Sequence, residues 1–492
     1  MKKITILFIL FCQCAFASFD MNENMQNSYQ YIINLEFEKA NDLLQKEQKS
    51  NSINGFIPLH QNYINFLTII ITEDIHYFEI AEKKKNNRID KLKENDKTSP
   101  YYLYSQAEVY LQWAFSRLKF EQYYTATLEF IKAYNLLKKN QEEFPDFTLN
   151  KKGLGLIHAL LGAVPERFHW MLNLAGLQGG IDLGLSELDD LLNDENYKIY
   201  ENEVLFLLSF LQINLNNNDS VCQKYLDRIG ESYKENYLLN FAAARLSHNL
   251  GQNDYCLNIL ENRPTHDGVF SFYYLDYLQG MSYLYKLDYK NAEQKFESFS
   301  ANFKGVNYIK SAYHKLAWIA SLQGDTEKEL SYFDKAISEG YTLIDEDKVA
   351  LKDAKTGVKN KYHIHLGLLR TRLLYDGGYY KKALGEINSV EILKKYSGFY
   401  DEYWYRLARI ESELNYEEKE VVEHYQKVYD LGQNSTNYYA PMSALQIGLI
   451  YEKQNNPNQA EIYLNKCLSL SDFDYERGIH QKAKAALERI SY

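Results

Sequence analysis

A pattern of small and large apolar residues recurs along the second half of this chain and limits the possible folds more than any other feature. In its clearest copy, Gly448 and Tyr451 are followed by Ala460, Leu464 and Cys467. This spacing puts small residues where two successive helices approach each other, and apolar residues on the buried face of the second helix. The pattern therefore predicts a row of helix pairs, each burying its apolar face against the next pair.

Other copies of the pattern support this prediction. They are anchored by Ala244, Cys256 and Leu260, by Gly280, Tyr283, Ala292 and Phe296, by Leu316, Ala317, Phe333 and Ala336, by Leu374, Ala383 and Ile387, and by Ala408, Val421, Tyr425 and Val428. Helix-breaking residues separate the two helices of a pair at 251–254, 324–325, 376–378 and 455–457. The spacing resembles that of the tetratricopeptide repeat, which implies a curved superhelix with a concave groove that holds a peptide or a partner helix.

The remainder of the chain is also predicted to be helical, since it holds only 7 prolines in 492 residues and few alternating apolar patterns. We predict an all-α protein, with an irregular helical region over residues 18–200 and a tetratricopeptide-repeat α-solenoid over residues 201–492. The apolar run at 64–71 is short and ends at Glu73 and Asp74, so we expect a buried helix there and no membrane-spanning segment.

Residues 1–17 have the composition of a secretory signal peptide. Lys2 and Lys3 precede an apolar stretch at 4–11, and Ala15 and Ala17 fit the small residues of a cleavage site before Ser18. Neither Cys12 nor Cys14 follows a small residue, which disfavours lipidation. We therefore expect an exported protein that is located in the periplasm or the outer envelope or is secreted, and the leader is typical of bacteria.

Charge and cysteine content exclude several classes of protein. The net charge is −11, and removal of the leader with its two lysines makes it more negative, so nucleic acid is not an expected partner. The basic run at 83–93 precedes Glu94 and Asp96 and is predicted to be a solvated helix end. Outside the leader, Cys222, Cys256 and Cys467 lie in apolar helical patterns and are expected in the core.

Glycines and one proline are concentrated at residues 153–188. Gly153 and Gly155 are expected to let two helices approach closely, and Pro165 to begin a new helix. Gly176 suits a left-handed helix end, Gly179 lies in a tight connector, and Asp182 is a candidate N-cap of the following helix.

The order of residues in this segment resembles that of the tetratricopeptide-repeat protein 39 and inclusion-body-clearance family, here in a secreted form. The matching positions are Gly153, Gly155, Leu160, Leu161, Pro165, Arg167, Gly176, Gly179, Gly184, Leu185 and Leu188, whereas Leu177 stands where the family has Phe. The resemblance implies a non-enzymatic adaptor, since members of the family are adaptors, some of them linked to lipid droplets, protein inclusions or lipid handling.

Aromatic residues are frequent on the first helix of the predicted pairs. Those proposed to line a groove are Tyr273, Tyr277, Tyr313, Trp318 and Trp404. Two interpretations remain open, because such rings either bind an extended peptide or partner helix, or pack between repeats.

Catalytic and metal-binding patterns are weak. Glu166, Arg167 and His169 fit solvated charges at a helix start, and His363 and His365 would point to different faces of a helix. No hydrolase, metalloprotease or phosphate-loop motif occurs in the sequence. We expect no enzyme activity, no cofactor and no metal.

The predicted function is that of a non-enzymatic adaptor that binds another protein or peptide of the periplasm or cell envelope. A glycan- or lipid-binding protein of the outer envelope is the alternative. Contact of the apolar segment at 160–177 with lipid, without spanning the membrane, is also left open.

Overall fold

A computed structural model of this chain describes residues 19–164, 176–216, 218–360, 364–390 and 398–490. These residues form helices, turns and loops without a β-strand among them, which confirms the predicted all-α class. Two compact units are present. The N-terminal unit comprises Met1–Ala243 and Arg263–Ser271, and the C-terminal unit comprises Ala244–Asn262 and Phe272–Tyr492. The boundary predicted at residue 200 falls inside the N-terminal unit; where the regular repeats begin stays a prediction.

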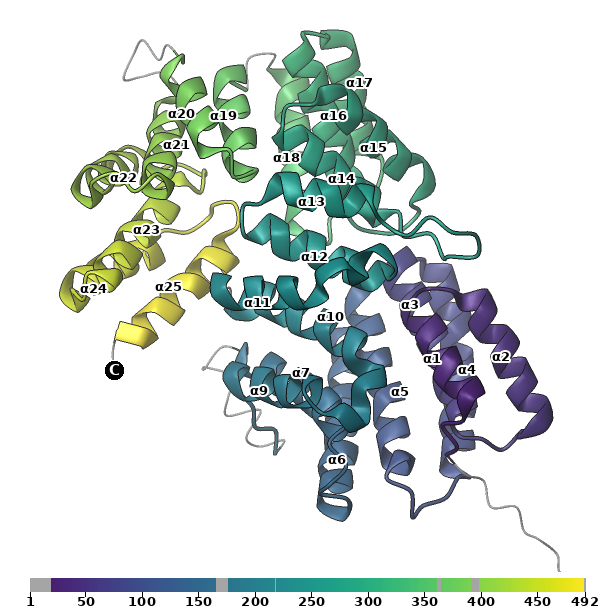
Figure 1. Ribbon diagram of the computed structural model, residues 1–492. Helices are drawn as coiled ribbons and strands as arrows, with labels where there is room; N and C mark the ends of the chain where they lie inside the picture. The colour runs from purple at the N-terminus through teal and green to yellow at the C-terminus, as the bar shows by residue number, and fades with distance from the viewer. Residues whose placement is uncertain (1–18, 165–175, 217, 361–363, 391–397, 491–492) are drawn as a thin grey trace, which may run out of the picture. The chain divides into compact units, whose positions relative to one another are not determined.

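The N-terminal unit consists of antiparallel helices that follow one another along the chain (Figure 1). They are α1 (Glu23–Ile33), α2 (Phe37–Ser50), α3 (Phe56–Thr72), α4 (Ile75–Lys93), α5 (Tyr101–Lys119), α6 (Tyr123–Glu143), α7 (Asn150–Gly162), α9 (Ile181–Leu192), η2 (Glu195–Tyr200), α10 (Glu201–Leu211), η3 (Gln212–Asn216), α11 (Asp219–Ile229) and η4 (Gly230–Lys234). The closest packing joins α5 to α6 and α7 to α9.

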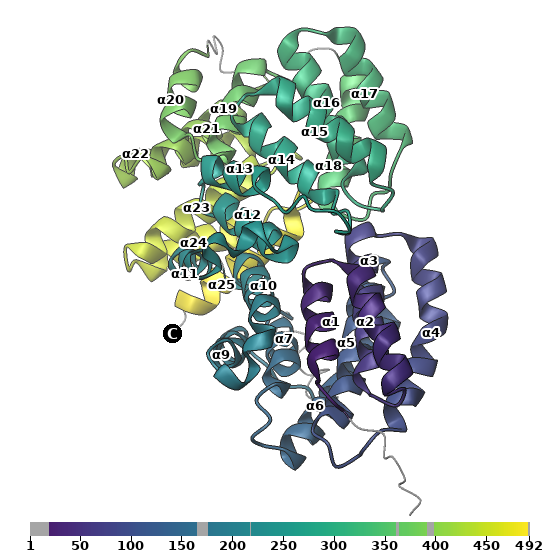
Figure 2. The same cartoon turned by 45° about the vertical axis from the view of Figure 1, so that its right-hand side comes forward.

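The C-terminal unit continues the succession of helix pairs. Its helices are α13 (Asn253–Glu261), α14 (Tyr274–Tyr285), α15 (Tyr289–Asn302), α16 (Ile309–Gln323), α17 (Thr326–Ser338), α18 (Asp345–Lys359), α19 (Leu366–Asp376), α20 (Tyr380–Asn388), α21 (Tyr400–Glu413), α22 (Glu418–Gly432), α23 (Tyr439–Lys453), α24 (Pro457–Leu468) and α25 (Glu476–Ile490). The helix α12 (Tyr237–Asn249) is divided between the two units. Figure 2 shows the pair α16 and α17 beside α14 and α15.

Local sequence explains where several helices begin. The side chains of Asp74, Asp288 and Asp325 accept hydrogen bonds from backbone N–H groups in the first turns of α4, α15 and α17. Asn456 does the same for α24, where Pro457 occupies the first turn. Between α16 and α17, Gly324 has a φ of 79°, a left-handed conformation that glycine adopts without steric cost.

The predicted repeat residues lie at the contacts within helix pairs. A side chain at Gly448 of α23 would lie 2.8 Å from Leu464 of α24, so the absence of one allows the two helices to meet. Ala460, Leu464 and Cys467 are fully buried. In the same way, Gly280 of α14 faces the ring of Phe296 on α15.

The apolar run at 64–71 lies within α3, where Ile64, Leu67, Ile69 and Ile71 are buried, as predicted. Among the described residues, no helix combines the length and apolar character that a membrane crossing requires.

Candidate functional site

The interior of the N-terminal unit holds a buried cluster of one lysine, two glutamates and two tyrosines. The ammonium of Lys152 on α7 lies 2.9 Å from Glu108 Oε2 on α5 and 2.9 Å from Glu203 Oε2 on α10. The hydroxyl of Tyr63 donates a hydrogen bond of 2.6 Å to Glu108, and Tyr29 donates to Glu203. Because the charges and donors of the cluster come from α1, α3, α5, α7 and α10, the cluster holds five helices together.

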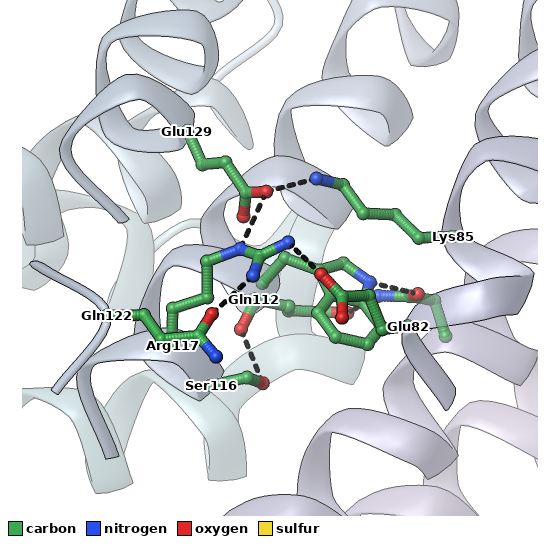
Figure 3. Close-up of polar contacts among 9 residues, drawn as sticks. Glu82, Lys85, Gln112, Ser116, Arg117, Gln122 and Glu129 are labelled. Atoms are coloured by element: carbon green, nitrogen blue, oxygen red, sulfur yellow. Dashed lines mark hydrogen bonds and ion pairs between the residues drawn. The ribbon is translucent and has the colours of Figure 1, made fainter. Parts of the chain in front are cut away.

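A second cluster in this unit contains Arg117 of α5, and Figure 3 shows its partners. The Nε atom of Arg117 donates to Glu129 Oε1 at 3.0 Å, and its other nitrogens donate to Glu82 and Gln122. Glu129 also accepts from Lys85 of α4. Here, too, the cation has a carboxylate or amide for each donating nitrogen.

This cluster corrects one expectation about the basic run at 83–93. Lys83 and Lys84 are exposed, but Lys85 and Arg88 are buried. Arg88 donates to the amide oxygens of Asn62 and Asn65 at 3.1 and 2.8 Å. The run was predicted to be a solvated helix end, whereas α4 continues through it and turns one face toward α3 and α5.

In the C-terminal unit, cations and aromatic rings meet at one place where the cations have no ion pair shorter than 3.5 Å among the described residues. We call this group the cation–aromatic cluster, and it consists of Lys315 and Trp318 on α16, Arg372, Tyr375 and Asp376 on α19, and Tyr405 and Arg409 on α21. The Lys315 ammonium lies 3.6 Å from the centroid of the Trp318 ring, and the Arg372 guanidinium lies 5.0 Å from it. Arg409 lies 3.9 Å from the centroid of Tyr375 and 5.5 Å from that of Tyr405.

One carboxylate serves the two guanidinium groups of this cluster. Arg372 Nε lies 3.5 Å from one oxygen of Asp376, and Arg409 lies 3.6 Å from the other. Neither distance is that of a short charge-assisted hydrogen bond. Among the described residues, Lys315, Arg372 and Arg409 have no hydrogen-bond acceptor. About a quarter of each arginine side chain is exposed, 27% for Arg372 and 26% for Arg409.

The electrostatic state of Lys315 reflects its burial beside another cation. Burial and the neighbouring Arg372 together lower the pKa of Lys315 to about 7, against the opposing effect of Asp353, Asp376 and Glu346. A lysine with such a pKa is only partly charged at neutral pH. An anion that approached Lys315 would restore its ordinary protonation.

The chemistry that this arrangement offers is the binding of an anion. A cation held over a ring face is positioned by the ring, but its N–H donors stay available to an acceptor. The buried indole N–H of Trp318 also has no hydrogen-bond acceptor among the described residues. The cation–aromatic cluster is therefore the candidate ligand site.

The residues predicted to line a groove occupy different environments. Tyr277, Tyr313 and Trp318 are buried, whereas Tyr273 and Trp404 are partly buried. Tyr277 packs its ring against Phe296 and Phe299, and Tyr313 donates a hydrogen bond of 2.8 Å to Glu339. Trp318 is the member of this set that belongs to the cation–aromatic cluster; a role of the others in binding stays a prediction.

Sequence reasoning did not identify Lys315, Arg372 or Arg409. Their spacing contains a local signal, because Lys315 precedes Trp318 by three residues, and Arg372 precedes Asp376 by four. Such pairs share a helix face, but they are common on solvated helices. What distinguishes these is that α16, α19 and α21 bring them together.

Several glycines of residues 153–188 lie where α7 packs on α9 and on the connector before it. A side chain at Gly155 would lie 2.8 Å from the backbone oxygen of Gly184, and one at Gly179 would lie 2.6 Å from that of His158. Gly153 likewise faces Leu137, and Gly176 has a φ of 69°. Pro165 and Arg167, with Glu166 and His169, lie outside the described residues.

One expectation for this segment was wrong. Asp182 was the candidate N-cap of α9, but the helix begins at Ile181, and Gly180 is the N-cap, with no side-chain hydrogen bond. Asp182 lies in the first turn instead, where a carboxylate still favours the helix dipole.

The potential metal ligands have other surroundings. His365 caps α19, its side chain accepting a hydrogen bond from the Leu368 N–H at 3.3 Å, while His363 lies outside the described residues. No group of histidine, cysteine and acidic side chains in the described part of the chain could hold a metal ion. Cys222, Cys256 and Cys467 are buried, as expected of core residues.

Comparison with known proteins supports the assignment of the repeats. The tetratricopeptide-repeat family model matches residues 311–339 and 443–474. These segments contain most of α16 with α17, and most of α23 with α24. The chain therefore contains tetratricopeptide repeats at two of the predicted positions.

A search of curated proteins finds no match. Similar solved structures include the "APC/C hetero-tetramer Cut9-Hcn1", with a TM-score of 0.29 and 11% identity over 94% of this chain and 95% of that one. Another is the "P58(IPK) TPR Domain", with a TM-score of 0.22 and 14% identity over 88% of this chain and 98% of that one. The assignment of the repeats rests on the family model and the helix pairs.

Proposed function

We propose that this chain is a non-enzymatic adaptor whose C-terminal unit binds a segment of a partner protein at the cation–aromatic cluster. Tetratricopeptide repeats, which the family model finds at 311–339 and 443–474, are helix pairs that stack into binding surfaces. The single observation that carries the site is that Arg372 and Arg409 share the Asp376 carboxylate, and that these two cations and Lys315 donate no hydrogen bond to the described residues. A protein segment would supply the acceptors.

We further propose that the protein acts outside the cytoplasm. The support is the pattern of Lys2, Lys3, the apolar stretch at 4–11 and the small residues Ala15 and Ala17. The partner would then be a protein of the periplasm or cell envelope. Amino-terminal sequencing of the exported protein is expected to begin at Ser18; an intact Met1 would contradict this proposal.

The resemblance of residues 153–188 to the tetratricopeptide-repeat protein 39 and inclusion-body-clearance family fits an adaptor role. It is supported by the packing of Gly155 on Gly184, since both positions of the shared pattern lie at one helix contact. Close packing of α7 on α9 thus explains why glycine stands at these two positions.

Site-specific photo-crosslinking in the native envelope tests the adaptor function. A photoreactive amino acid at Tyr375, inside the cluster, is expected to form a defined protein adduct. The control position is Tyr416, which is 42% exposed but lies in the turn between α21 and α22. Equal adducts at both positions, or no protein adduct at Tyr375, would contradict the proposal.

A further inference from the structure

The positive charges of the cation–aromatic cluster are distributed over three helices. Lys315 lies on α16, Arg372 on α19 and Arg409 on α21. Contact of both Lys315 and Arg372 with the Trp318 ring connects α16 to α19, and the shared Asp376 connects Arg372 to Arg409. The three cations therefore form one continuous row.

Tyrosines extend this row on both sides. Arg245 on α12 faces Tyr274, Tyr285 and Tyr308. On the other side, Tyr405 packs against Tyr438 and Tyr439, with ring centroids 5.6 and 5.0 Å apart. Tyrosine hydroxyls donate hydrogen bonds to carboxylates, as Tyr313 does to Glu339 elsewhere in this unit.

The row differs from the cation clusters described above in how loosely its cations are paired with carboxylates. In the N-terminal unit, Lys152 is matched by Glu108 and Glu203. In the row of the C-terminal unit, Asp376 pairs with Arg372 and Arg409, while Asp353 and Glu346 of α18 act on Lys315 from a neighbouring element. These carboxylates equal the cations in number, but among the described residues none of them forms an ion pair shorter than 3.5 Å with a cation of the row.

The kind of ligand is indicated by which faces of the aromatic rings are covered by cations. Sugars bind to free faces of aromatic side chains, but Lys315 covers one face of Trp318 and Arg409 covers one face of Tyr375. The groups left available are N–H donors with positive charge. Guanidinium groups bind carboxylates through two parallel hydrogen bonds, and an extended acidic segment can present carboxylates to helices that lie side by side.

We propose that this row binds an acidic segment of the partner, with side-chain carboxylates of Asp or Glu docking on Arg372, Arg409 and Lys315. This inference rests on the proposed adaptor function and specifies its ligand. A single carboxylate at a chain end would reach only part of the row, because the three cations lie on different helices. A segment with several acidic side chains can contact all three cations.

Binding is expected to depend on pH through Lys315. The charged groups that face it are Arg372 and Asp376 from α19 and Asp353 and Glu346 from α18. The pKa of Lys315 is lowered to about 7 in the free protein, and an acidic ligand raises it, so binding takes up a proton. Affinity should therefore fall as the pH rises through and above 7, where deprotonation of the free lysine competes with binding.

The test is isothermal titration calorimetry of the whole protein, once with a terminally blocked oligoglutamate peptide and once with its oligoglutamine counterpart. We expect only the oligoglutamate to bind. Arg372→Gln and Arg409→Gln should each weaken its affinity by about tenfold. The matched control is Arg370→Gln, also on α19, which removes a cation that pairs with Glu386 outside the row and should leave the affinity unchanged.

Three results would overturn the inference: binding of oligoglutamine as tightly as oligoglutamate, no binding of oligoglutamate, or equal weakening by Arg370→Gln. A requirement for a free C-terminal carboxylate would also overturn it. Thermal unfolding of each variant separates loss of binding from loss of folding, and Arg409→Lys, which keeps the charge but not the paired N–H donors, provides a milder change.

The adaptor function and this inference can fail separately. If a partner crosslinked through Tyr375 binds Arg372→Gln as tightly as the unaltered protein, the adaptor function stands and the acidic ligand is wrong. If oligoglutamate binds as expected but no protein adduct forms in the envelope, the anion site stands and the adaptor function is wrong.

Discussion

Two glycines at the contact between α7 and α9 have no room for a side chain. A Cβ atom at Gly184 would collide with the backbone oxygen of Gly155 and the backbone nitrogen of Ala159. Backbone atoms cannot rotate away as a flexible side chain can, so the helices would have to separate. This explains why the segment is rich in glycine without requiring a ligand.

We predict that Gly184→Ala lowers the free energy of unfolding of the N-terminal unit by about 3 kcal/mol. The matched control is Gly385→Ala on α20, where a Cβ atom would meet nothing within 4 Å. That change should stabilise its unit by about 0.5–1 kcal/mol, because alanine favours the helix. Denaturant unfolding and hydrogen exchange of both variants measure the difference; equal effects would refute the packing argument.

Neighbouring lysines on α7 have opposite environments. Lys152 is buried between Glu108 and Glu203, whereas Lys151 is partly exposed and lies 2.8 Å from Asp190. We predict that Lys152→Met costs about 3–5 kcal/mol, because two buried carboxylates lose their cation. Lys151→Met should cost less than about 1 kcal/mol. Chemical denaturation compares them, and similar losses would show that the buried cluster does not stabilise the unit.

Among the helices, α18 interrupts the regular succession of pairs. It packs against both α16 and α17 and buries Asp347, whose carboxylate accepts hydrogen bonds from the N–H groups of Tyr308 and Ser311 at 2.7 and 2.9 Å. Tyr308 has a φ of 66° at the start of α16. A carboxylate from one helix thus caps the beginning of another.

We predict that Asp347→Ala destabilises the C-terminal unit by about 1–3 kcal/mol, because two buried N–H groups lose their acceptor. Asp345→Ala, in the same turn of α18, removes an exposed carboxylate paired with Lys348 and should change stability by less than about 0.5 kcal/mol. Thermal unfolding of the two variants decides between a cap and a dispensable surface charge; an unchanged melting temperature for Asp347→Ala would exclude the cap.

Each unit contains a fully buried histidine that stays neutral when folded. Burial lowers the pKa of His60 in the N-terminal unit to about 3 and that of His314 in the C-terminal unit to about 4, from an ordinary value of 6.5. The unfolded chain therefore binds protons as the pH falls below 6.5, whereas the folded chain does not. The stability contributed by these neutral side chains is complete above 6.5 and is lost progressively toward pH 4.

We predict that both units lose stability between about pH 6.5 and pH 4, by on the order of a few kcal/mol for each histidine. His60→Gln and His314→Gln should each make the decline shallower in their own unit, as followed by hydrogen exchange across this range. His76→Gln replaces an exposed histidine of α4 and should leave the slope as it is. A slope insensitive to all three changes would assign acid sensitivity to other groups.

The sequence by itself determined the class of the fold and the position of two tetratricopeptide repeats. This was possible because residues such as Gly448, Ala460 and Leu464 act within one helix pair, so their spacing carries the information. The turns at Gly324 and Asn455, both with positive φ, were recognised for the same reason.

Only the tertiary structure decided which charges are compensated. Lys85 and Arg88 looked solvated in sequence, but α4 turns them toward carboxylate and amide oxygens of other helices. Conversely, Lys315, Arg372 and Arg409 resemble ordinary surface cations until α16, α19 and α21 gather them around Asp376. Charge balance at a site depends on groups far apart in the chain, and helical periodicity reports only on neighbours along one helix.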